Sequence, residues 1–286
     1  MAFEFRRGPR AVEVGHLTPV ELYRDAGLWR SVIGHRPLVL PWQVRPYRRE
    51  ILADGIALYS ADRSPKSLVV GFCGRDHRLF LSVGMILQTL DHTRFDLMTV
   101  VDPAELHFDS GVEGYANSLV ELAGRLSDVV AARGYSGVVT YGTSMGGLPA
   151  LRVGLLMGAD RAVAAGGRFA WNIGRLLRGE KHVGAFDLLC RCRKPGKTEI
   201  YAIFSEGHDG DVESAQRLAA IRPDSRLLPL PCLDHNFVYE IQKARRLDEY
   251  HREIFDLRRK PDPAVLRRSL TKRSRLDPRR TFYIGL

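Results

Sequence analysis

The sequence lacks any long apolar run and is poor in cysteine. No stretch of about 18 apolar residues occurs in its 286 residues, so an ordinary membrane-spanning helix is excluded. The first residues are charged and have no apolar segment of the kind found in signal peptides. Four cysteines are few for a chain that can bury a large core without disulfides. We therefore expect reduced thiols in a cytoplasmic protein.

Metal-site spacing, internal repeats and low-complexity tracts are also missing. Cys190 and Cys192 form a close pair, but no second pair and no histidine stands at zinc-ligand spacing from them. Free thiols are therefore favoured over a zinc site, and we expect neither a metal nor a cofactor. The absence of repeats excludes solenoids and other repeat architectures.

Positive charge is abundant, but it lies at the ends of the chain. The net charge is +10, and residues 257–286 hold ten basic and only two acidic side chains, whereas residues 67–256 are close to neutral. A near-neutral body argues against specific nucleic-acid binding. The basic tail predicts a solvated arm that contacts an acidic partner. Its apolar end, "RTFYIGL", leaves docking on the body as an alternative. The sequence thus divides into an N-terminal extension (1–47), a core (48–256) and a basic tail (257–286).

Strand and helix patterns alternate through the core. A hairpin around Asp54-Gly55 is predicted over 49–60. Apolar strands are predicted over 67–74, 95–102, 136–141, 160–167, 198–205 and 225–231. Helices are predicted over 79–90, 114–134, 211–221 and 236–255, and directly after residue 146. This alternation predicts an α/β fold with a mostly parallel central sheet and helices on both faces.

The segment "YGTSMGGLPALRV" places Ser144 at a junction between a strand and a helix. Gly142 and Gly146 stand two residues on either side, so neighbouring backbone can approach closely. This is the G-x-S-x-G pattern in the setting where it presents a nucleophilic hydroxyl at the apex of a sharp turn. The N–H groups of the following helix would favour a developing oxyanion. A nucleophilic role for Ser144 is therefore favoured over an ordinary turn.

From these motifs the chain resembles the α/β-hydrolase superfamily over about residues 48 to 256. "ILADGIALYSADRSPKSLVVGFCG" resembles the opening hairpin and third strand of that superfamily, and "YGTSMGG" resembles its nucleophile elbow. The resemblance implies the order serine, acid, histidine along the chain. His235, in "PCLDHNFVYE" after the last strand, matches the position of the histidine. The alternative for His235 is an ordinary surface or core histidine.

Three carboxylates compete for the role of the triad acid. "SEGHDGDVESA" offers Glu206, Asp209 and Asp211 after the strand at 198–205. Asp211 has a structural alternative as the N-cap of the next helix. Asp209 lies nearer the strand end and has no such alternative, so we favour Asp209 and keep Asp211 as the second candidate.

The resemblance also implies an oxyanion hole of two backbone N–H groups. Met145, which follows the nucleophile, matches the first donor. The second donor belongs to the loop after "VVGFCG", where Arg75 is the best candidate. This loop departs from the HGGG pattern of lipases, since Cys73-Gly74-Arg75 stands there. Arg75 has a second reading, in which its guanidinium binds an anionic group of the substrate.

The segment between the strands at 160–167 and 198–205, where relatives often insert a lid, has only about thirty residues. We therefore expect a small lid or none.

Taken together, the sequence predicts a serine hydrolase that cleaves an ester or amide of a small-molecule or acyl-bearing substrate through an acyl-enzyme on Ser144. Acyl transfer by the same triad is one alternative. A catalytically silent scaffold that binds a partner is another.

Overall fold

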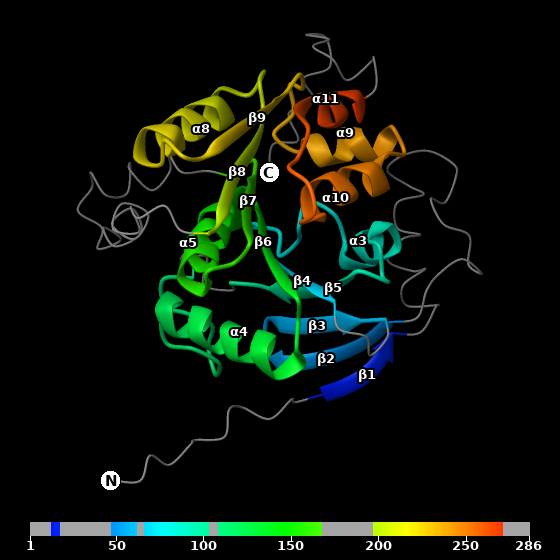
Figure 1. The fold of residues 1–286 in the computed structure, drawn as a ribbon, viewed down its shortest axis with the longest axis vertical. Helices are drawn as coiled ribbons and strands as arrows, with labels where there is room; N and C mark the ends of the chain where they lie inside the picture. The colour runs from blue at the N-terminus through cyan, green and yellow to red at the C-terminus, as the bar shows by residue number, and fades with distance from the viewer. Residues whose placement is uncertain (1–12, 18–46, 62–65, 103–107, 168–196, 271–286) are drawn as a thin grey trace.

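The computed structural model describes residues 13–17, 47–61, 66–102, 108–167 and 197–270. These residues form one open, nine-stranded sheet in the order β1-β2-β3-β5-β4-β6-β7-β8-β9, with helices on both sides (Figure 1). The strands are β1 (Glu13–Leu17), β2 (Tyr47–Ala53), β3 (Ile56–Ser60), β4 (Ser67–Phe72), β5 (Phe95–Val100), β6 (Gly137–Thr143), β7 (Arg161–Ala165), β8 (Glu199–Ser205) and β9 (Arg226–Leu230).

The larger part of the sheet is parallel. β5, β4, β6, β7, β8 and β9 run side by side in the same direction, while β1, β2 and β3 pair antiparallel at one edge. The predicted hairpin is β2–β3, with Gly55 of the turn at a positive φ of 81°. Because the parallel strands all end at the same edge, the loops that follow them gather there, which is where sites form in such sheets.

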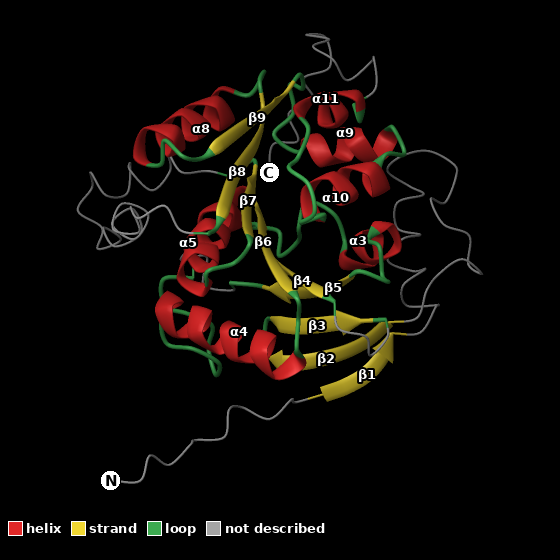
Figure 2. Cartoon of the chain, viewed as in Figure 1, coloured by secondary structure: helices red, strands yellow, loops and turns green. Residues whose placement is uncertain are grey.

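Helices cover both faces of the sheet (Figure 2). One side holds α4 (Leu119–Arg133), α5 (Gly147–Met157) and α8 (Asp209–Ile221), and the other holds α3 (Val83–Thr89), α9 (Phe237–Lys243), α10 (Leu247–Phe255) and α11 (Pro263–Arg268). Successive strand residues point to opposite faces, so Val69 packs in the α9–α10 layer and Val70 in the α4–α5 layer. The predicted α/β fold is confirmed.

Three predicted helices differ from those observed. The helix expected over 114–134 begins only at Leu119, after the N-cap Ser118. The helix expected over 79–90 begins only at Val83, because Phe80 has a positive φ of 62° and Ser82 forms the N-cap. The helix expected over 236–255 is divided into α9 and α10, and Arg245 between them has a φ of 58°. A backbone in the left-handed region cannot continue an α-helix, so each break is local.

Segments on both sides of the predicted core join it. β1 pairs with β2 at the sheet edge, although it lies in the predicted N-terminal extension. α11 lies beyond residue 256, and Leu266 and Leu270 are both buried in the same cluster as α10. The expectation of a solvated tail therefore fails for residues 257–270, since these two leucines remove apolar surface from water by packing there. The rest of the tail, including "RTFYIGL", lies outside the described residues.

Two further expectations fall partly or wholly outside the described residues. The segment 168–196, for which we expect a small lid or none, is not described, and neither are Cys190 and Cys192. The other two cysteines, Cys73 and Cys232, are buried free thiols. In the described part of the chain, every helix is too short or too polar to cross a membrane.

Candidate active site

Ser144 lies at a sharp turn between β6 and α5, in a single turn of 3-10 helix (η2, Ser144–Gly146). Its φ is 50°, a conformation that costs free energy for a residue with a side chain. The flanking glycines make the turn possible. A Cβ on Gly142 would lie 1.9 Å from the carbonyl oxygen of Gly146, and a Cβ on Gly146 would lie 2.1 Å from that of Phe72. The turn thus depends on both glycines of the motif.

His235 lies in the loop between β9 and α9, within hydrogen-bond distance of the serine. Its Nε2 is 3.0 Å from Ser144 Oγ, although 91 residues separate them in the chain. The neighbouring Asp234 holds this loop in place, because its carbonyl accepts the hydroxyl of Ser205 at the end of β8 and its carboxylate accepts the N–H of Asn236. The loop that carries the imidazole is therefore hydrogen-bonded to the end of β8 and to the start of α9.

The carboxylate that contacts His235 belongs to Asp211 and not to Asp209. Asp211 Oδ1 lies 2.6 Å from His235 Nδ1, and the Asp211 side chain is fully buried. Asp209 is exposed. The preference for Asp209 is thus corrected on geometry, and the second candidate is the one brought to the histidine. Glu206, the third candidate, is exposed and pairs with Arg267.

The reason for this correction is the position at which α8 begins. His208 is the N-cap, so Asp209 is the first helical residue and Asp211 the third. Residues two apart on a helix point to nearly opposite sides, since each residue turns about 100°. The alternative role of Asp211 as the N-cap of this helix is not observed, because the capping side chain is that of His208.

The electrostatics of Asp211 favour the charged carboxylate. Burial by itself would raise its pKa, but hydrogen bonds from His208 and His235, together with their charges, outweigh this and lower the pKa below its usual value. The carboxylate is therefore ionised at neutral pH. An ionised acceptor at 2.6 Å fixes the proton of His235 on Nδ1 and leaves the Nε2 lone pair facing Ser144.

Phe80 and Gly166 border His235 from the other side. The Phe80 ring meets the imidazole edge to face, with ring centroids 5.4 Å apart. Gly166, just after β7, has a φ of 59°, and a Cβ there would lie 3.0 Å from His235 Cε1 and 3.1 Å from Phe80 Cζ. These two residues leave the imidazole little room to rotate away from Ser144. Sequence reasoning missed both, although the glycines at the end of the predicted strand 160–167 were a usable signal.

The loop after β4 runs beside Ser144, where the sequence predicts the second oxyanion donor. A Cβ on Gly74 would lie 3.1 Å from the Thr143 carbonyl and 3.5 Å from Ser144 Cβ. The Arg78 carbonyl accepts both the Gly74 N–H and the Thr143 hydroxyl, which ties this loop to the end of β6. The Gly74 N–H is therefore already hydrogen-bonded within the protein.

The two residues predicted to donate to the oxyanion lie next to these positions. Arg75 is exposed and follows Gly74 directly, and Met145 follows Ser144 in η2. The oxyanion roles of these two residues stay predictions.

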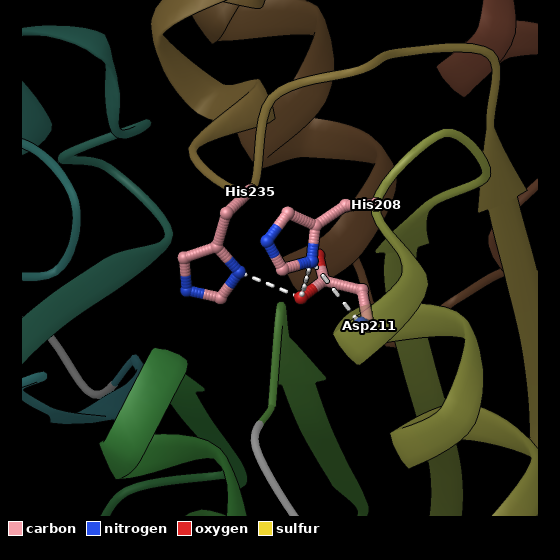
Figure 3. A group of neighbouring side chains, drawn as sticks. All are labelled: His208, Asp211 and His235. Atoms are coloured by element: carbon pink, nitrogen blue, oxygen red, sulfur yellow. Dashed lines mark hydrogen bonds and ion pairs between the residues drawn. The ribbon is translucent and has the colours of Figure 1, made fainter. Parts of the chain in front are cut away.

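A second histidine contacts the same aspartate. His208 Nδ1 lies 3.0 Å from Asp211 Oδ1, and its ring centroid is 5.1 Å from that of His235 (Figure 3). From the sequence, His208 is expected to be solvated or to line the cleft, and a contact with Asp211 is not predicted. The only signal was the spacing of three residues between His208 and Asp211, which brings them together once His208 caps the helix.

Comparison with known proteins relates this chain to others through its fold. No protein-family model matches the sequence, and no curated protein matches it. Among solved structures, it is similar to a 2,6-dihydroxy-pseudo-oxynicotine hydrolase, with 14% identity, a TM-score of 0.52, and coverage of 77% of this chain and 71% of that one. It is also similar to the capsule O-acetyltransferase of Neisseria meningitidis serogroup A, with 12% identity, a TM-score of 0.50, and coverage of 74% and 95%. The chain has the α/β-hydrolase fold.

Proposed function

We propose that this protein is a serine hydrolase that cleaves an ester or amide through an acyl-enzyme on Ser144. The observation that carries the proposal is the continuous contact from Ser144 Oγ to His235 Nε2 and from His235 Nδ1 to Asp211 Oδ1. A nucleophile, a base and a group that orients the base are the three parts that acyl transfer to a serine requires. All three lie just beyond the carboxyl ends of parallel strands: Ser144 in η2, Asp211 in the first turn of α8 and His235 in the loop after β9.

In the first step His235 Nε2 accepts the hydroxyl proton of Ser144 while Oγ attacks the acyl carbon of the substrate. The imidazolium that forms is stabilised by the buried carboxylate of Asp211 and then gives its proton to the leaving group. Water attacks the acyl-enzyme by the reverse sequence of proton transfers and releases the acid. The backbone N–H groups of Met145 and Arg75 are the proposed donors to the oxyanion.

A fluorophosphonate probe tests this function without knowledge of the substrate. We expect covalent labelling of the wild type and its loss in Ser144→Ala and His235→Ala, because the probe reacts only with an activated serine. Ser127→Ala is the matched control, since Ser127 lies on α4 and its hydroxyl donates only to the backbone of its own helix. Labelling that persists in Ser144→Ala would place the nucleophile elsewhere and refute the proposal.

Acyl transfer to an acceptor other than water is the second candidate, since the same three residues perform it. The similarity to a capsule O-acetyltransferase over 95% of that protein's length supports keeping it. The two functions differ in how the acyl-enzyme is resolved. A hydroxyl-bearing acceptor, such as an oligosaccharide, should divert an acetyl group from free acetate to an acetylated acceptor if transfer is the function.

The silent-scaffold alternative predicts no labelling at all in a folded protein. The partner expected for the basic tail and the cytoplasmic location stay predictions from the sequence.

A further inference from the structure

Three side chains of types that can bind metal ions meet near Ser144: His208, Asp211 and His235. One donor atom from each lies within 4.8 Å of the other two. Both imidazoles turn Nδ1 toward the same carboxylate oxygen, at 3.0 Å for His208 and 2.6 Å for His235 (Figure 3). His208 comes from the start of α8 and His235 from the loop before α9, so the two rings approach the carboxylate from different elements.

The spacing and the type of donor atom suit a tetrahedral metal ion. Zn²⁺ binds imidazole nitrogen and carboxylate oxygen at about 2.0–2.2 Å, which places neighbouring ligand atoms about 3.3 Å apart. The observed separations, from 2.6 Å to at most 4.8 Å, bracket that value. Small rotations of the two rings would therefore bring all three atoms to an ion.

The second carboxylate oxygen of Asp211, Oδ2, could also contact a cation. Asp211 Oδ2 is buried and has no hydrogen-bond partner among the described residues. A buried carboxylate oxygen without a donor is costly, and a cation would offset that cost. The two rings are 29% and 18% exposed for His208 and His235, so an ion can reach them from solvent.

We propose that His208, Asp211 and His235 form a binding site for a divalent ion of the zinc class, and that an ion bound there holds the serine inactive. A ligand nitrogen cannot carry a proton. Binding at His235 Nδ1 therefore moves the ring proton to Nε2, and the number of protons on the ring does not change. Nε2 then donates to Ser144 Oγ and cannot accept its proton, so the base is lost while Ser144 stays in place.

The inhibition rests on the proposed role of Ser144, whereas metal binding does not. His208 takes no part in the proposed proton transfers, but its Nδ1 accepts the Asp211 N–H at the start of α8, so its replacement must keep a side-chain acceptor there. His208→Gln keeps an amide near Asp211 but removes the second imidazole. Loss of one of three ligands should weaken zinc binding by more than the roughly 10- to 100-fold that loss of an outer-shell partner costs. His92→Gln, a substitution of a histidine in the turn that precedes β5, is the matched control.

The experiment measures zinc binding and serine reactivity separately. Isothermal titration of the full-length protein with ZnCl₂ reports binding, and Co²⁺ absorption reports a tetrahedral site containing imidazole. The rate of fluorophosphonate labelling reports reactivity, with and without Zn²⁺ and after EDTA. We expect Zn²⁺ to slow labelling of the wild type and His92→Gln at least tenfold and reversibly, and to have little effect on His208→Gln at the same concentration.

The outcomes separate the two proposals. Zinc binding that depends on His208, in a protein that is never labelled, would support the metal site and refute the proposed nucleophile. Strong labelling with no zinc binding, or zinc inhibition of equal strength in His208→Gln, would overturn the metal site. If His208→Gln is poorly folded, His208→Asn tests the same ligand.

Discussion

Replacing Asp211 with asparagine should abolish most of the activity while leaving the protein folded. The carboxylate lies 2.6 Å from His235 Nδ1 and its side chain is fully buried, so no water molecule can take over its role. An asparagine in the same place carries no charge to stabilise the imidazolium, and its NH₂ group can donate to Nδ1 and so hold the wrong tautomer. Substitutions of this kind lower kcat about 10⁴-fold in serine proteases, which is about 5.5 kcal/mol of barrier.

The effect on stability should be much smaller. Asp211→Asn exchanges the charge-assisted hydrogen bond from His235 for a neutral one, at a cost of about 1–3 kcal/mol and a few degrees in Tm. Asp209→Asn is the matched control, two residues away. Asp209 is exposed at the first position of α8, so its loss removes only a favourable charge at the helix N-terminus, worth about 0.3–1 kcal/mol.

The assay combines steady-state hydrolysis of an activated aryl ester, fluorophosphonate labelling rate and thermal melting on the same preparations. We expect a drop of about four decades in both rates for Asp211→Asn and less than a twofold change for Asp209→Asn. A folded Asp211→Asn protein within tenfold of the wild type would refute the role assigned to this carboxylate. So would an Asp209→Asn protein that has lost a thousandfold.

Three further predictions concern stability. Gly146→Ala should disrupt the turn at Ser144 and remove fluorophosphonate labelling, because its Cβ would lie 2.1 Å from the Phe72 carbonyl oxygen. The control Gly124→Ala, on α4, adds a Cβ that meets nothing within 4 Å and should be neutral or stabilising. Equal melting temperatures of the two variants would contradict this prediction. Burial lowers the pKa of His251 to about 4 from 6.5, so the unfolded state binds the proton more readily and stability should fall by about 3 kcal/mol as pH drops from 6.5 to 4. Urea unfolding across that range should show a weaker pH dependence in His251→Gln, and an unchanged slope would rule the histidine out. Truncation after residue 256 should lower Tm by many degrees because it removes the buried Leu266, whereas truncation after residue 270 should not lower Tm. If both truncations lower Tm equally, or neither does, residues 257–270 do not stabilise the fold.

Local pattern was enough to predict most of the fold and two of the three residues of the proposed triad. Continuous apolar strands between helices specify a covered parallel sheet, because only burial on both faces explains strands without polar alternation. Glycines around Ser144 at the end of such a strand specify the elbow, because a sharp turn requires residues without a Cβ. His235 follows the last strand, and the loops that follow parallel strands gather at one edge of the sheet. Its position near Ser144 could therefore be predicted from the order of the strands.

The identity of the acid was decided only by tertiary structure. Asp209 and Asp211 lie in one turn of α8, and the residue that faces His235 depends on where the helix begins and how it is rotated against the sheet. That start is set by the side chain of His208, a residue type not preferred at N-caps, so no propensity predicts it. The contact between the His208 imidazole and Asp211 likewise depends on where α8 begins. His235 reaches Asp211 from a loop 24 residues away in the chain, and only packing determines which atoms of such separate elements meet.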